Sequence, residues 1–154
     1  MIELLDHSAR NIANQIYRVF QQSYQVEAGL VGVEDEEFPP LRRSAPHIQT
    51  SNSQFLGARI GSGLAAVIEL THEGEHLSIN SLVVHPQYFR RGLAGQLLQL
   101  ALDKFDWRSA DVETAAANEP AISLYRKFGF AITRYWKTDA GIQKVLLSRR
   151  RAAQ

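Results

Sequence analysis

The chain has 154 residues, enough for one domain of ordinary size with its own hydrophobic core. A net charge of +1 argues against a protein that holds nucleic acid mainly by bulk charge, so nucleic acid is not an expected partner. The absence of cysteine excludes disulfides, thiolate metal sites and thiol nucleophiles. The apolar runs are too short for a membrane span and the N-terminus lacks the pattern of a secretory signal, so we expect a soluble, cytoplasmic protein.

Apolar spacing predicts a helix in the first part of the chain. Four residues fall at i, i+4, i+7 and i+8, the spacing of one helical face: Ile12, Ile16, Val19 and Phe20. Asp6 or Ser8 is the expected N-cap of this helix. Residues 25–51 contain an acidic run at 34–37 and a pair of prolines, and no element ends are assigned there.

A meander of three strands is expected next, over residues 54–60, 64–70 and 76–84. Gly61-Ser62-Gly63 is the signal for the first turn, and residues 71–75 form the second. In the third strand the apolar alternation slips by one residue across Asn80 and Ser81. One extra residue reverses the alternation, so the slip predicts a β-bulge, and bulges often occur beside functional sites.

The remaining elements alternate between helix and strand. We expect helices over 92–105 and 118–128, a short strand over 110–115, and two final strands over 130–136 and 142–148. Asn118 is the expected N-cap of the second helix and Gly129 its C-terminal stop. The tail at 148–151 is expected to fray. This order predicts one domain over residues 1–154 with a mixed α/β sheet.

The turn Arg90-Arg91-Gly92-Leu93-Ala94-Gly95 joins the third strand to the next helix. Such a junction presents free backbone N–H groups beside the positive end of the helix dipole, which favours binding of a phosphate or pyrophosphate. Gly92 allows a ligand to approach the backbone, and the two arginines add positive charge. The alternative is an ordinary strand-to-helix turn with exposed arginines.

Two segments resemble the signatures of one family. Residues 82–95 resemble the acetyl-CoA-binding motif of the GNAT superfamily, Arg/Gln-x-x-Gly-x-Gly/Ala, in which Gly92 and Ala94 match and Phe89 replaces the usual Arg or Gln. Asn118-Glu119-Pro120-Ala121-Ile122-Ser123-Leu124-Tyr125-Arg126-Lys127-Phe128-Gly129-Phe130 resembles the second signature, Asn-x-x-Ala-x-x-Leu-Tyr-x-x-x-Gly-Phe, at every named position. The two motifs in this order are more specific than either alone.

The resemblance implies a mostly antiparallel sheet of six or seven strands, splayed at the cofactor site and flanked by about four helices. It also implies acetyl-CoA as co-substrate, with direct transfer of the acetyl group to an amine and no metal. Members of the family commonly dimerise, which leaves a homodimer open. The cofactor contacts that it implies are Leu82, Val83, Val84, Arg90, Arg91, Gly92, Leu93, Ala94, Gly95, Asn118 and Tyr125.

The resemblance also suggests the acid and the base. Tyr125 occupies the position of the tyrosine that donates a proton to the CoA sulfur, although a core aromatic is the alternative. Glu113 corresponds to a glutamate that deprotonates the amine in members acetylating ribosomal-protein N-termini; the alternative is a solvated or ion-paired glutamate. Weaker candidates for the base are Glu69, Glu75 and His76. The histidines and glutamates of residues 72–76 are expected to form a solvated cluster rather than a metal site.

These observations predict an N-acetyltransferase that acts on a primary amine of a small molecule, peptide or protein. The alternative function is a non-catalytic acyl-CoA-binding module that regulates or accompanies another protein. A toxin-like acetylation of aminoacyl-tRNA finds little support, because the charge is near neutral. No motif in the chain indicates which amine is the acceptor.

Overall fold

A computed structural model of the chain describes residues 1–152, apart from the side chain of Glu36. Residues 153 and 154 of the expected domain, and part of the acidic run at 34–37, therefore lie outside the described residues. None of the helices within residues 1–152 is long and apolar enough to cross a membrane.

Within the described residues, seven strands form one sheet in the order β1-β2-β3-β4-β5-β7-β6. They are β1 (Ile2–Leu5), β2 (Gln54–Ile60), β3 (Gly63–Glu73), β4 (His76–Val84), β5 (Ser109–Ala115), β6 (Ala131–Lys137) and β7 (Gln143–Arg150). All neighbouring strands are antiparallel except β4 and β5, which are parallel. The expected mixed α/β fold with a mostly antiparallel sheet is confirmed.

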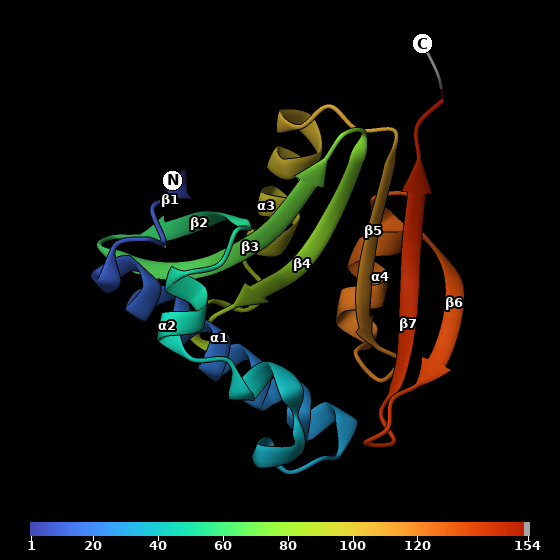
Figure 1. The fold of residues 1–154 in the computed structure, drawn as a ribbon, viewed down its shortest axis with the longest axis horizontal. Coiled ribbons are helices and arrows are strands. Elements are labelled where there is room, and N and C mark those ends of the chain that lie inside the picture. The colour runs from blue at the N-terminus through green and yellow to red at the C-terminus, as the bar shows by residue number, and fades with distance from the viewer. Residues whose placement is uncertain (153–154) are drawn as a thin grey trace.

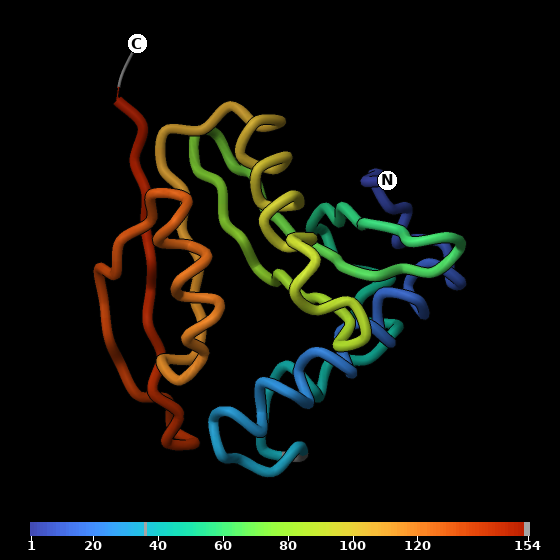
Figure 2. The backbone as a smooth tube through the Cα atoms, turned by 180° about the vertical axis from the view of Figure 1, so that it is seen from behind, coloured from blue at the N-terminus to red at the C-terminus, as the bar shows by residue number. Residues whose placement is uncertain are grey.

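Four α-helices cover the two faces of this sheet (Figures 1 and 2). They are α1 (Arg10–Val31), α2 (Ala45–Gln49), α3 (Leu93–Lys104) and α4 (Glu119–Lys127). Helices α3 and α4 lie on one face, and α1 and α2 lie on the other, beside β2 to β4. Two short 3-10 helices, Asp35–Glu37 and Pro39–Arg42, connect α1 to α2.

The sheet separates two hydrophobic clusters, because successive side chains of a strand point to opposite faces. On β3, Val67 packs in the cluster beneath α1, which includes Phe20. Its neighbour Ile68 packs in the cluster beneath α3, which includes Leu97. Both faces of β3 are therefore buried, and this fixes the register of its pairing.

Strands β4 and β5 pair over only part of their length. Their register runs from His76 opposite Ser109 to Ile79 opposite Val112, and the remaining residues of each strand do not pair with the other. Figure 1 shows the two strands side by side at one end and apart at the other. Parting of the two central strands leaves room for a ligand between them.

The separation begins at a bulge in β4. Ile79 lies opposite Leu70 of β3, and Ser81 lies opposite Glu69, so Asn80 is the extra residue. The bulge expected across Asn80 and Ser81 is thus confirmed. It turns the second half of β4 away from β5, because a bulge bends the strand that carries it.

The expected cap of the first helix is wrong. Ala9 is the N-cap of α1, and Asp6 instead accepts a hydrogen bond from the Ser8 amide in the turn before the helix. The helix also continues to Val31 and ends at Gly32, whose φ of 83° suits the left-handed C-terminal position. Because the helix is this long, its last turns reach the place where β4 and β5 separate.

Two other expectations need correction, and one strand was not predicted. Strand β1 was not expected, because its four residues have little pattern and pair only with the edge of β2. Strand β3 extends to Glu73, so the second turn is shorter than residues 71–75. The tail does not fray: Arg149 donates to the Phe128 carbonyl, and Arg151 donates to the Leu102 carbonyl and lies 3.9 Å from the Trp107 ring centre.

Candidate active site

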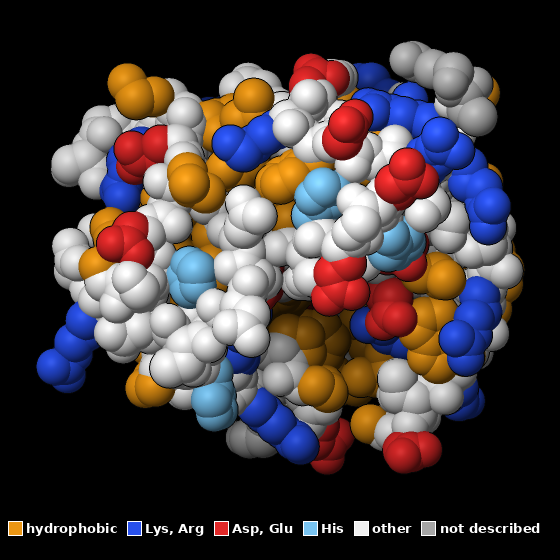
Figure 3. All heavy atoms as spheres, turned by 45° about the horizontal axis from the view of Figure 1, so that its top comes forward, with side chains coloured by type: hydrophobic (Ala, Val, Ile, Leu, Met, Phe, Trp, Pro, Cys, Tyr) orange, Lys and Arg blue, Asp and Glu red, His pale blue; other side chains and the backbone are white. Residues whose placement is uncertain are grey.

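A cavity of about 400 Å³ lies where β4 and β5 separate. Its walls come from both halves of the sheet: Asn80, Ser81 and Leu82 on β4, and residues 112–115 on β5. The space-filling view shows a hollow with hydrophobic side chains at its bottom and acidic side chains on its edge (Figure 3). A cavity bounded by several elements and containing titratable groups is the strongest candidate for a functional site.

Four of the residues expected at the site line this cavity together: Leu82, Glu113, Asn118 and Tyr125. The side chains of Val83 and Val84 do not line it. Val83 is buried in the cluster beneath α1, and Val84 packs against the cluster beneath α3. These two valines can reach a ligand in the gap only through their backbone groups.

Tyr125 lies on α4 with its ring against Phe130, at 5.9 Å between ring centres, and is 4% exposed. Burial raises its pKa far above the ordinary value of 10.0, and the nearby Tyr24 and Glu27 raise it further. The hydroxyl is therefore protonated at neutral pH. A neutral phenol on the cavity wall can donate a proton or a hydrogen bond to a group inside.

Glu113 extends from β5, just beyond the last residue that pairs with β4. It lies opposite Leu146 of β7, and its side chain is exposed while it contributes to the cavity wall. A carboxylate here is open to water and to any ligand that enters the cavity.

Asn118 caps α4 as the sequence predicts. Its Oδ1 accepts a hydrogen bond of 3.3 Å from the Ala121 amide, and the helix ends near Gly129, whose φ is 89°. The cap fixes the start of the helix that carries Tyr125.

The turn at 90–95 lies outside the cavity lining, at the N-terminus of α3. Within residues 1–152, no backbone N–H of this turn donates a hydrogen bond. Arg90 and Gly92 have φ values of 66° and 76°, and the space beside Gly92 is open. Free N–H groups at a helix N-terminus, flanked by exposed arginines, fit a pyrophosphate.

Two other residues of the turn have different surroundings. A Cβ placed on Gly95 would lie 3.8 Å from the side chains of Leu124 and Phe128, so this glycine faces α4 across a close helix–helix contact. Phe89, at the usual Arg or Gln position, is 43% exposed and leaves the backbone donors accessible.

Sequence reasoning missed the wall that α1 contributes. Tyr24 and Glu27 line the cavity, and Asn118 Nδ2 donates a hydrogen bond of 3.1 Å to Glu27 Oε1. Burial raises the pKa of Glu27 above its ordinary value, partly offset by the hydrogen bond from Asn118 and the charge of Lys144. The signal was available: Tyr24 and Glu27 follow Phe20 by four and seven residues, on the buried face of a longer helix.

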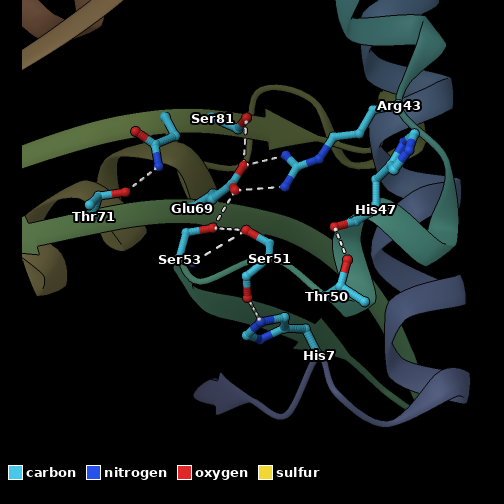
Figure 4. A network of polar contacts seen from close by, with 10 residues as sticks. His7, Arg43, His47, Thr50, Ser51, Ser53, Glu69, Thr71 and Ser81 are labelled. Atoms are coloured by element: carbon cyan, nitrogen blue, oxygen red, sulfur yellow. Dashed lines mark hydrogen bonds and ion pairs between the residues drawn. The ribbon is translucent and has the colours of Figure 1, made fainter.

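Glu69, a weaker candidate for the base, has a different role. Its Oε1 and Oε2 accept hydrogen bonds of 2.6 and 2.8 Å from the guanidinium of Arg43, and it also accepts from Ser53 and Ser81 (Figure 4). Burial alone would raise the pKa of this carboxyl, but the bonds from Arg43 and Ser53 and the charge of Arg43 lower it overall. The ion pair connects the segment before α2 to β3, and the hydrogen bond from Ser81 connects Glu69 to the bulge of β4.

The histidines and glutamates near the β3–β4 turn also lie away from the cavity. His76 contacts Ser109 Oγ at 2.7 Å and Asp111 Oδ2 at 3.1 Å, and Glu75 lies 3.3 Å from Arg108. No group of three or more His, Asp or Glu side chains in the described part of the chain is arranged to hold a metal ion.

Two curated proteins are similar to the chain in sequence. The chain is 36% identical over 143 residues to UPF0157 protein YqkA of Bacillus subtilis. The aligned stretch covers 92% of this chain but only 41% of YqkA. It is 27% identical over 114 residues to N-alpha-acetyltransferase RimI of Mycobacterium tuberculosis, covering 71% of each chain. The chain thus spans about two fifths of YqkA and most of RimI.

The fold resembles a solved structure over nearly its whole length. This is the PaiA N-acetyltransferase of Thermoplasma acidophilum in complex with coenzyme A, with a TM-score of 0.77 and 20% identity over 98% of this chain and 99% of that one. The sequence pattern of the Acetyltransferase (GNAT) family matches residues 13–130, which include most of α1, the bulged strand, the turn and Tyr125. The chain therefore belongs to the GNAT acetyltransferase family.

Proposed function

We propose that the chain is an N-acetyltransferase that moves the acetyl group of acetyl-CoA directly to a primary amine of a small molecule, peptide or protein. The observation that carries the proposal is that Tyr125 and Glu113 line one cavity at the separation of β4 and β5. The family match and the coenzyme A complex of the similar PaiA structure support the choice of co-substrate.

In this proposal the turn at 90–95 holds the pyrophosphate through its free N–H groups, with Arg90 and Arg91 adding positive charge. The part of β4 beyond the bulge offers its unpaired edge, residues 82–84, to the pantetheine arm. On the opposite wall of the cavity, the side chain of Asn118 contacts the cofactor in this proposal. Acetyl-CoA supplies the thioester whose acetyl group is transferred.

The proton transfers are assigned to two side chains. Glu113 accepts a proton from the acceptor ammonium, directly or through water, so that the amine nitrogen can attack the acetyl carbonyl carbon. As the carbon–sulfur bond breaks, Tyr125 donates its phenolic proton to the leaving sulfur, and the second proton of the attacking nitrogen passes through water to the tyrosinate, so that the amide, the thiol and neutral Tyr125 are the products. The raised pKa of Tyr125 ensures that the phenol is protonated when the reaction begins.

For the acceptor, we propose only a chemical class, a primary amine. Because the similar RimI is named an N-alpha-acetyltransferase, peptides with a free N-terminus belong in the test beside small aliphatic amines. We place the enzyme in the cytoplasm, because a chain without cysteine has no disulfide that would need an oxidising compartment.

A direct test incubates the protein with acetyl-CoA and a panel of alkylamines, diamines, amino acids and short peptides, and follows both CoA release and the acetylated amine. Amine-dependent turnover that falls in Tyr125→Phe and Glu113→Gln is expected. Tight binding of acetyl-CoA without turnover on any amine would contradict the enzyme and favour an acyl-CoA-binding module.

A further inference from the structure

Glu27 places a carboxylate on the cavity wall opposite β5. It extends from the penultimate turn of α1, outside both family motifs, and lines the cavity with Tyr24, Asn118 and Tyr125. Glu113 lines the same cavity from β5. Two carboxylates therefore border the space beside the proposed proton donor.

The charges around the cavity do not cancel. The basic residues in its lining are Arg43 and Lys144. Arg43 is held by Glu69 through two hydrogen bonds, so its charge is already matched. Lys144 remains to balance both Glu27 and Glu113, while Tyr24 and Tyr125 stay neutral because burial raises their pKa values. When both carboxylates are ionised, the described lining has an excess of one negative charge, which favours a singly charged cation.

We propose that Glu27 binds the ammonium group of the acceptor and makes the cavity select a cationic amine over a neutral molecule of the same shape. This inference rests on the proposed function and deepens it by naming the residue that recognises the acceptor. Glu27 binds the amine from the α1 wall, and Glu113 takes its proton from the β5 wall.

A purely structural role for Glu27 does not explain why this position carries a negative charge. The hydrogen bond from Asn118 Nδ2 needs only an acceptor oxygen, which a glutamine side chain would supply as well as a carboxylate. The charge is not required for the α4 cap, because Asn118 Oδ1 makes that bond with the Ala121 amide. A buried charge costs stability unless it is fully paired, and the hydrogen bond from Asn118 and the charge of Lys144 offset only part of the effect of burial on the pKa of Glu27. Perturbed carboxylates in cavities are typical of functional sites.

The Glu27→Gln variant separates charge from packing, since it keeps the oxygen for Asn118 and removes the negative charge. The matched control is Glu34→Gln, which removes a charge from an exposed residue outside the cavity lining. Each protein is saturated with coenzyme A and titrated by NMR with n-butylammonium, and in parallel with n-butanol as the neutral probe.

We expect the parent and Glu34→Gln to bind n-butylammonium at least about tenfold more tightly than n-butanol, the size of one charge-assisted hydrogen bond. Glu27→Gln should lose most of this preference while its affinity for coenzyme A changes less than about twofold. In turnover, the same variant should raise KM for the amine more than it lowers kcat.

Several outcomes would overturn the inference. They are an unchanged preference in Glu27→Gln, equal binding of the two probes by the parent, and no binding of either. The titration needs no turnover, so failure of the proposed function would appear separately, as a parent protein that binds n-butylammonium through Glu27 but acetylates no amine.

Discussion

Asn118 donates a hydrogen bond of 3.1 Å to Glu27, and this contact joins the N-cap of α4 to the first helix across the cavity. Asn118 belongs to a family motif, whereas Glu27 lies in the part of the chain where the sequence offers no motif. The contact brings the proposed proton donor and the proposed acceptor-binding carboxylate into one site. The first helix therefore lines the cavity as well as the core, and in our proposal it also binds the acceptor.

Replacing Tyr125 by phenylalanine removes the hydroxyl and keeps the buried ring. If Tyr125 protonates the leaving sulfur, kcat should fall by roughly 10²- to 10³-fold while affinity for acetyl-CoA stays near that of the parent. Steady-state kinetics and calorimetric titration measure the two quantities. Tyr135→Phe is the control, because Tyr135 lies on β6 and is 71% exposed. Near-normal kcat in Tyr125→Phe would show that the ring serves only packing.

The Glu69→Gln variant should lose stability in a pH-dependent way. Breaking one side of a buried ion pair costs about 3 kcal/mol in the free energy of unfolding. Because the pKa of Glu69 is lowered in the fold, its contribution is present above the ordinary value of 4.5 and is lost as pH falls below it. Urea unfolding of parent and variant at several pH values should show their difference shrinking below that value. A difference independent of pH would contradict the ion pair.

Glu27→Gln should show the opposite dependence. The pKa of Glu27 is raised in the fold, so the ionised form destabilises the protein, and its penalty grows as pH rises above the ordinary value of 4.5. The variant should therefore be more stable than the parent at neutral pH and equal to it in acid. The same urea series measures this, with Glu34→Gln as reference. A variant that is less stable at neutral pH would show that the charge supports the fold.

Arg151 should matter for stability although it lies near the end of the chain. Its guanidinium donates a hydrogen bond of 2.8 Å to the Leu102 carbonyl and covers the Trp107 ring. Arg151→Ala should lower the free energy of unfolding by about 1 to 2 kcal/mol. The exposed Arg150, replaced by alanine, should have little effect. If both substitutions change the free energy of unfolding equally little, the tail contributes no stability and the prediction is wrong.

The sequence predicted those parts of the fold and site whose signals are local. The bulge at Asn80 appears as a slip in alternation, and the cap at Asn118 and the turn at Gly92 depend on residues within a few positions. The helical spacing after Phe20 could have placed Glu27 on the buried face of α1, but its contact with Asn118 could not be predicted, because the two residues are distant in the chain. The same holds for Arg43 and Glu69. Strand β1 was missed for the same reason, since it exists only as a partner for β2.

The central claim is tested most directly by calorimetric titration of acetyl-CoA into the parent and into Gly92→Glu, which puts a negative side chain beside the proposed pyrophosphate site. Gly61→Glu is the matched control, because Gly61 also has a positive φ, 62°, and open space around it, in the β2–β3 turn. The account predicts saturable binding to the parent and to Gly61→Glu, with binding lost in Gly92→Glu. Folded parent protein that does not bind acetyl-CoA, or Gly92→Glu that binds it as well as the parent does, would contradict it.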